Sequence, residues 1–246
     1  MDEILRQHTI GRPLPAPKAK KRRLRGEQGR DPYDALRPWS AITHGAGAAL
    51  GIVASALLLT RAVQLGGRLR IIVFAIYCAS MLALYTASTL YHSINTSVKG
   101  RMALRRLDHA SICLLIAGSY TPVCLLCLKG WLGWTRFGRI WAMAVAGIAL
   151  AIVWIMAPRW LTAGVYLAMG WLAILAVYPL SQALVPRGMA LLLAGGLLYT
   201  AGGILYALKW PGREAPRFGC HEIFHLFILA GSLCHFLMMY QVVVFA

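Results

Sequence analysis

Acidic residues are scarce in this sequence: its 246 residues include 8 Asp and Glu, against 25 Lys and Arg. Charged residues of both signs make up only 13% of the chain, whereas hydrophobic residues make up 59%. Soluble domains carry about 25% charged residues. This number of charged residues is too small to cover a water-exposed surface. The composition therefore favours an integral membrane protein over a soluble one.

The net charge of +17 does not indicate a nucleic-acid-binding protein. Lys and Arg are confined to the amino-terminal segment and to the stretches between apolar runs, which is the distribution typical of membrane proteins. We therefore expect no nucleic-acid partner.

The apolar residues are concentrated in seven runs, each read as one membrane-spanning helix of about 20 residues. The runs are 39–60, 71–91, 108–128, 140–157, 160–180, 188–208 and 219–244. The fold class predicted is therefore an all-α integral membrane protein with seven transmembrane helices. Pro122 and Pro179 lie within two runs and are expected to kink those helices, whereas Pro158 and Arg159 alone separate the fourth run from the fifth.

Residues 1–38 are polar and contain the basic cluster KAKKRRLR at 18–25. We expect a disordered cytoplasmic tail that precedes the transmembrane domain, 39–246. The cluster would attract anionic lipid headgroups, although its main role is expected to be topological. Since the tail has no apolar segment of the kind found in signal peptides, the first run is expected to direct its own insertion.

The distribution of Lys and Arg also predicts an orientation. With the tail inside, 18 of these residues lie on the inner side and 7 on the outer side. This predicts a cytoplasmic amino terminus and an extracytoplasmic carboxyl terminus. Most of this asymmetry comes from the tail.

All six cysteines lie within or beside apolar runs: Cys78, Cys113, Cys124, Cys127, Cys220 and Cys234. Cys124 and Cys127 have the spacing of a metal or redox pair. We favour the simpler interpretation that they pack as small apolar residues of a helix.

Ionisable side chains within membrane spans are costly and by default mark a functional site. The alternation of spans places the end of the second run and the starts of the third and seventh on one side of the membrane. His92 lies at the first of these points, Asp108 at the second, and His221 with His225 at the third. We therefore expect these side chains to meet at one depth near one face.

His221 and His225 are one helical turn apart, so they share a helix face with about 6 Å between them along the axis. This spacing matches half of a zinc site. His92 is the best candidate for a third ligand, which would leave one tetrahedral position for water, as in catalytic zinc sites. Asp108 is expected to hold that water or orient a ligand, and Ser88 to hydrogen-bond Asp108 or the water. Calcium and magnesium prefer oxygen ligands and fit less well.

Three further histidines lie within or beside the apolar runs. His44 lies at a similar depth on the first run and remains a fourth candidate ligand. His235 lies about 15 Å deeper than His225 by helical rise, so it is expected to pack within the bundle. His109 points away from Asp108 and is expected to face the headgroups.

His221, Glu222 and His225 also form the His-Glu-x-x-His pattern of zinc proteases. An intramembrane protease would need another ligand, commonly a carboxylate in an Asn/Pro/Asp-Gly context on another span. Asp108 is followed by His-Ala rather than by glycine, and the sequence offers no other such segment. Proteolysis is therefore disfavoured.

At these residues the sequence resembles the hemolysin III family, the bacterial branch of the progestin and adipoQ receptor group. The stretches that carry the resemblance are STLYH (88–92), RLDHASICLLIAGSYTP (106–122) and HEIFHLFILAGSLCHF (221–236), supported by THGAGAALGI (43–52). The resemblance implies a location in the bacterial inner membrane, an inside amino terminus and a cytoplasmic-side zinc site. It implies zinc ligation by His92, His221 and His225, with Asp108 reaching the metal through water and Ser88 as the motif serine.

The motif layout is also similar to that of alkaline ceramidases, which suggests zinc-dependent hydrolysis of a membrane lipid amide. Zinc would lower the pKa of bound water and polarise the carbonyl of a lipid substrate, with Asp108 as the general base aided by Ser88. The alternatives are a membrane-disrupting or pore-forming protein and a lipid sensor with structural zinc. A closed site with four protein ligands, including His44, would favour the sensor.

Overall fold

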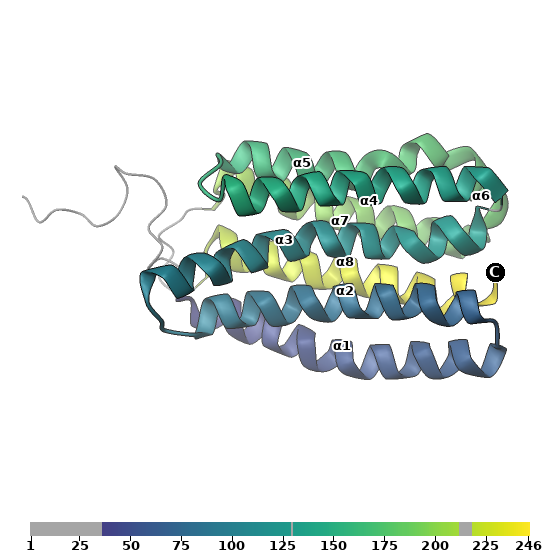
Figure 1. Cartoon of the computed structure of the whole chain (residues 1–246), viewed down its shortest axis with the longest axis horizontal. Helices are drawn as coiled ribbons and strands as arrows, with labels where there is room; N and C mark the ends of the chain where they lie inside the picture. Colours follow the sequence, from purple (N-terminus) through teal and green to yellow (C-terminus); the bar gives the residue numbers. More distant parts are fainter. Residues whose placement is uncertain (1–35, 129, 212–217) are drawn as a thin grey trace, which may run out of the picture. The chain divides into compact units, whose positions relative to one another are not determined.

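A computed structural model describes residues 36–128, 130–211 and 218–246, and this part of the chain is helical without strands (Figure 1). Seven helices are long and apolar enough to cross a membrane, which confirms the predicted fold class. The elements are α1 (Pro38–Leu65), α2 (Arg68–Ser93), α3 (Val98–Pro122), the π-helix η2 (Val123–Cys127), α4 (Gly130–Val153), α5 (Arg159–Trp171), the 3-10 helix η3 (Leu172–Ala176), α6 (Val177–Ala183), α7 (Pro186–Leu208), α8 (Cys220–Gln241) and η4 (Val243–Phe245).

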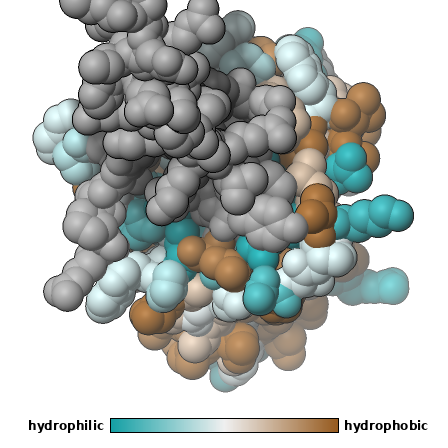
Figure 2. Space-filling view, turned by 90° about the vertical axis from the view of Figure 1, so that its left-hand side faces the viewer, coloured by the Kyte–Doolittle hydropathy of each residue, from teal (hydrophilic) through white to brown (hydrophobic). Residues whose placement is uncertain are grey.

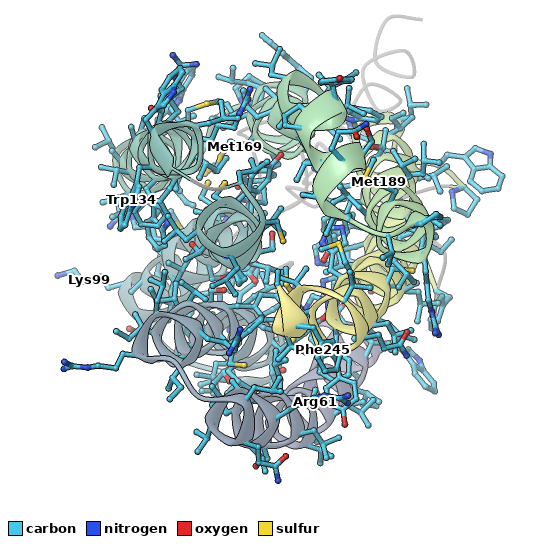
Figure 3. All side chains as sticks on the ribbon, turned by 90° about the vertical axis from the view of Figure 1, so that its right-hand side faces the viewer. Arg61, Lys99, Trp134, Met169, Met189 and Phe245 are labelled. Carbon is cyan, nitrogen blue, oxygen red and sulfur yellow. The ribbon has the colours of Figure 1, made fainter. Side chains whose placement is uncertain are left out.

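Successive membrane-spanning helices of the described residues run antiparallel, and α8 returns to pack beside α1 (Figure 1). This order places the end of α2 and the starts of α1, α3 and α8 at the same end of the bundle. Hydrophilic side chains at that end are interspersed with apolar ones (Figure 2). At the opposite end, Arg61 of α1 lies over the ring of Phe245 with 4.6 Å between guanidinium carbon and ring centre (Figure 3).

Two helices begin ten residues earlier than predicted. α3 starts at Val98 rather than at residue 108, because the Ser97 hydroxyl caps its first turn by accepting a hydrogen bond from the Gly100 N–H (3.2 Å). α4 starts at Gly130 rather than at residue 140. Both additions contain Arg or Lys, which end an apolar run without ending a helix. α4 also stops at Val153, so the break before α5 is longer than the two-residue turn predicted.

Each proline predicted to kink a helix lies where the helix changes type. Pro122 is followed directly by the π-helix η2, and Pro179 of α6 follows the 3-10 segment η3. Proline removes the N–H that would bond the carbonyl four residues earlier. For Pro179 that carbonyl belongs to Leu175, and it accepts a hydrogen bond from the Arg136 guanidinium of α4 instead (2.6 Å). A neighbouring helix thus compensates for the break in the fifth span.

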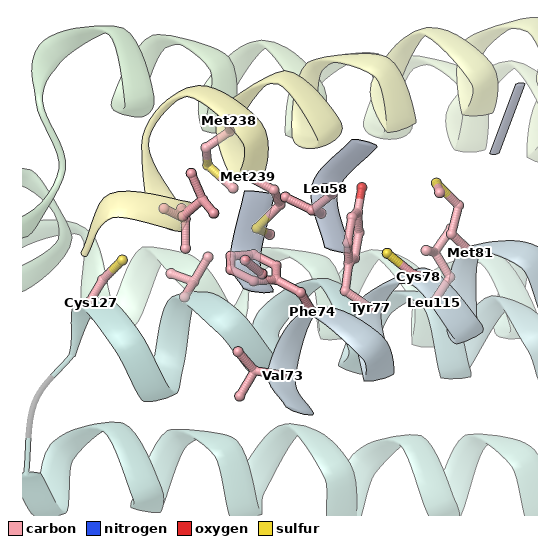
Figure 4. Close-up of a cluster of buried hydrophobic side chains, with 14 of the residues drawn as sticks. Leu58, Val73, Phe74, Tyr77, Cys78, Met81, Leu115, Cys127, Met238 and Met239 are labelled. Carbon is pink, nitrogen blue, oxygen red and sulfur yellow. The ribbon is translucent and has the colours of Figure 1, made fainter. Parts of the chain in front are cut away.

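The largest apolar core joins α1, α2 and α8, with contributions from η2 and η4. Leu58, Phe74 and Met239 are among its fully buried side chains (Figure 4). Nearer the histidines, Gly47 permits close approach of the same helices: a Cβ there would lie 2.7 Å from Leu229 of α8 and 2.8 Å from Tyr85 of α2. This packing fixes the relative positions of the three helices that carry His44, His92, His221 and His225.

Candidate metal centre

The structure brings His92 of α2 together with His221 and His225 of α8. One ring nitrogen of each lies within 4.8 Å of the others, and His92 Nε2 is 3.0 Å from His221 Nε2. His92 and His225 are almost fully buried (3% and 2% exposed), and His221 is partly buried. Within the described ranges, this is the one group of three or more His, Cys, Asp or Glu residues close enough to hold a metal ion.

The contacts around His225 orient its ring for metal binding. Its Nδ1 donates a hydrogen bond to the backbone carbonyl of Ser40 on α1 (3.3 Å), and the Thr43 hydroxyl lies 3.4 Å from the same nitrogen. With the proton on Nδ1, the lone pair belongs to Nε2. A backbone carbonyl that fixes the tautomer in this way is typical of metal-bound histidine.

The donor set also fits a nitrogen-preferring ion. Two ligand nitrogens of a tetrahedral zinc site, each about 2.1 Å from the metal, lie about 3.4 Å apart. The observed 3.0 Å between His92 and His221 is close to this spacing. Three imidazoles suit zinc or another transition metal better than magnesium or calcium. The residues present therefore fit such an ion, although its identity stays a prediction.

His44 is close to this group but cannot share its metal. Its ring stacks on the ring of His225, with centroids 3.5 Å apart and planes 8° from parallel. A metal bound to an imidazole lies near the plane of that ring. An ion in the plane of His225 would therefore lie well outside the parallel plane of His44. The fourth-ligand role considered for His44 is not compatible with this stacking.

Asp108 and Ser88 lie in the wall of a cavity that His221 and His225 also line. Asp108 is 8% exposed, and the Ser88 side chain and the Arg105 guanidinium are close enough to interact with its carboxylate. Although Asp108 is ten residues into α3 rather than at its start, it still reaches this end of the bundle. Its carboxylate is not part of the three-histidine group, so the structure leaves its predicted role through water open.

Glu222 has a different set of contacts from the glutamate of a zinc protease. Its Oε1 accepts hydrogen bonds from the Ser40 hydroxyl (2.9 Å) and the Arg37 guanidinium (3.2 Å). Its Oε2 accepts the N–H of Gly219 (2.9 Å), which caps the start of α8. Oε1 thus ties the first turn of α8 to the start of α1, whereas Oε2 caps α8 itself. Glu222 therefore has a local hydrogen-bonding role at the start of α8.

Comparison with known protein families shows the family of this chain. A sequence model described as haemolysin-III related matches residues 37–236. The chain belongs to this family. It is 43% identical to Hemolysin-3 of Bacillus cereus over 199 residues, which cover 80% of this chain and 87% of the relative. It is 45% identical to the Hemolysin-3 homolog of Bacillus subtilis (strain 168) over 145 residues, which cover 59% and 68%.

Membership of the haemolysin-III related family and the seven apolar helices make the chain an integral membrane protein, consistent with the predicted bacterial inner membrane. The predicted orientation of the termini stays a prediction. The predicted disordered tail lies almost entirely outside the described residues, which begin at residue 36, and so does its proposed contact with anionic headgroups.

A cavity of about 350 Å³ extends from the histidines into the bundle. His44, Ser88, Asp108, His221 and His225 line it at one end. The rest of its wall is mainly apolar and comes from α3, α4, α5, η3, α7 and α8. Such a space suits a ligand with one polar end and an apolar body.

Of the two remaining histidines, His235 lies where the sequence predicted and His109 does not. His235 packs within the bundle as predicted, edge-on to Tyr199 (5.2 Å) and against Gly195, where a Cβ would be only 2.3 Å from its ring. His109 does not simply face the headgroups. It is half-buried and lines the cavity, and its carbonyl accepts a hydrogen bond from the Tyr166 hydroxyl (3.3 Å).

Sequence reasoning missed Arg37 and Ser40 as parts of the site. The Arg37 backbone N–H donates to the carbonyl of His92 (3.2 Å), and its side chain binds Glu222, so it links the ends of α2 and α8. Neither residue lies near His92, His221 or His225 along the chain. The one indication in the sequence is Glu222, because an acid within an apolar run needs a polar or charged partner.

Proposed function

We propose that this protein is a zinc-dependent hydrolase that cleaves an amide bond of a membrane lipid. The observation that carries the proposal is the three-histidine group beside a mainly apolar cavity, because two of its members, His221 and His225, line the polar end of that cavity. The stacking of His44 also argues against a closed site with four histidine ligands. A site with three protein ligands keeps a position for water, as catalysis requires.

His92, His221 and His225 would hold the ion. A bound zinc ion would supply a polarising charge for the carbonyl of the substrate and lower the pKa of a coordinated water. The Asp108 carboxylate would accept a proton at the polar end of the cavity and pass it to the leaving amine. The Ser88 hydroxyl would donate a hydrogen bond to that carboxylate and hold it in place. The apolar wall would take up the acyl chain and exclude bulk water.

The test is turnover of labelled lipid amides by the purified protein after its zinc content has been measured. A panel of N-acyl sphingoid bases and N-acyl ethanolamines covers the substrate class. We expect release of fatty acid that stops when a chelator removes the metal and resumes when zinc is added. Zinc-loaded protein that releases no fatty acid from any member of the panel would contradict the proposal.

The names of the relatives favour a second candidate, a protein that disrupts membranes. The apolar wall of the cavity speaks against an aqueous pore through it. Dye leakage from liposomes separates the two functions. Leakage that is equal for the parent and His221→Ala would favour membrane disruption independent of the metal, whereas no leakage would leave the hydrolase as the better account.

The third candidate is a lipid sensor in which zinc is structural. It requires a site without an exchangeable water. A metal-bound structure with a side chain at the fourth position would favour the sensor, and water at that position would favour the hydrolase.

A further inference from the structure

His44 is a buried side chain whose contacts use neither of its ring nitrogens in a hydrogen bond. It is 3% exposed, and neither of its ring nitrogens has a hydrogen-bond partner among the residues that the structure describes. A neutral imidazole always carries one N–H donor and one acceptor nitrogen. Buried polar atoms are nearly always paired, so a fully buried imidazole without partners requires an explanation.

Packing does not explain why this residue is a histidine. One face of its ring stacks on His225, and the ring lies edge-on to Tyr85, with centroids 5.2 Å apart. A phenyl ring would make both contacts and would carry no unpaired nitrogen. The stacking also prevents His44 from sharing a metal with His225. His44 also lines the cavity together with Asp108 and Ser88, so a molecule bound in that cavity is the partner that we consider for its ring.

We propose that His44 is a ligand-binding residue whose ring N–H donates a hydrogen bond to a carbonyl or carboxylate oxygen at the polar end of an acyl lipid. The oxygen would lie in the cavity beside the three histidines, and the acyl chain would lie along the apolar wall. The inference deepens the proposed function and rests on it for the identity of the ligand. It assigns His44 a role in holding the substrate or the fatty-acid product, separate from holding the metal.

The test measures binding of tritium-labelled palmitic acid, which is the type of product expected and cannot be turned over further. The parent is compared with His44→Phe, which keeps the ring contacts but removes both nitrogens, and with His44→Gln, which restores an N–H donor. Tyr85→Phe is the matched control: it changes a polar group beside His44, but Tyr85 does not line the cavity. Zinc content and the thermal midpoint in detergent are measured for each protein.

We expect His44→Phe to bind palmitic acid about tenfold more weakly, since one hydrogen bond is lost. Its zinc content should be unchanged and its thermal midpoint no lower, because the phenyl ring leaves no polar atom unpaired. His44→Gln should recover part of the affinity, and Tyr85→Phe should bind like the parent. A purely structural histidine would instead lower the thermal midpoint when replaced.

The inference is overturned by equal binding in the parent and His44→Phe, by no binding in the parent, or by loss of zinc from the His44 variants. It is also overturned if His44→Gln binds no better than His44→Phe. The test does not use amide turnover. A parent that binds palmitic acid through His44 but cleaves no lipid amide would refute the hydrolase and leave the binding site in place.

Discussion

Ser40 of α1 and His225 of α8 are joined by a hydrogen bond of 3.3 Å from the imidazole Nδ1 to the backbone carbonyl. The Ser40 hydroxyl donates a second hydrogen bond to α8, to Glu222 (2.9 Å). One residue of the first helix therefore orients a candidate metal ligand and anchors the helix that carries it. The relation makes α1 part of the candidate metal centre, although none of its residues is a candidate ligand in the described structure.

Replacement of Glu222 tests this anchoring role. Glu222→Ala leaves the buried partners Ser40 and Gly219 without an acceptor, so we expect a loss of about 2–3 kcal/mol of stability. Glu222→Gln should lose less and should keep turnover within about tenfold of the parent, because Gln can still accept one of these hydrogen bonds. Thermal unfolding in detergent and turnover of a lipid amide measure the two effects. A zinc protease would lose turnover almost completely with Gln at this position.

Asp108 and Ser88 are predicted to contribute to the rate of hydrolysis rather than to metal binding. We expect Asp108→Asn to lower kcat by at least about 100-fold, because an amide cannot take up the proton. Ser88→Ala should have a smaller effect, since it removes a polar neighbour of the carboxylate and leaves the proton acceptor in place. Zinc content should match the parent in both variants. Loss of zinc from Asp108→Asn would show instead that the carboxylate is needed to hold the ion.

Gly47 is predicted to be intolerant of any side chain. Its Cβ would approach Leu229 and Tyr85 within 3 Å, so Gly47→Ala should destabilise the protein by about 1–3 kcal/mol. Gly164→Ala is the matched control, because a Cβ there has no neighbour within 4 Å. It should be neutral or stabilising by up to about 1 kcal/mol. Thermal midpoints in the same detergent compare the two, and equal midpoints would contradict the close approach of α1 to α8 and α2.

Arg136 is predicted to stabilise the broken fifth span. Arg136→Ala leaves the Leu175 carbonyl without the donor that replaces the missing N–H of Pro179, and we expect a loss of about 1–2 kcal/mol. Arg139→Ala is the control, since Arg139 lies on the same helix and is exposed. A thermal midpoint that falls equally in both variants would mean that the hydrogen bond to Leu175 does not matter.

The sequence predicted the seven spans and the meeting of His92, His221 and His225, because both follow from apolar run length and the alternation of helices. It could not predict the starts of α3 and α4, since charged residues end an apolar run but a helix continues through them. It also could not predict that His44 stacks on His225, or that Arg37 and Ser40 bind Glu222. These contacts depend on the rotation of each helix about its axis, which is set by packing at residues such as Gly47.

The most direct test of the account is the zinc content of the purified protein beside His92→Ala, His225→Ala and His44→Phe. We expect about one zinc ion per chain in the parent and in His44→Phe, and almost none when His92 or His225 is replaced. Zinc that is absent from the parent, or retained after either alanine substitution, would contradict a metal centre formed by α2 and α8.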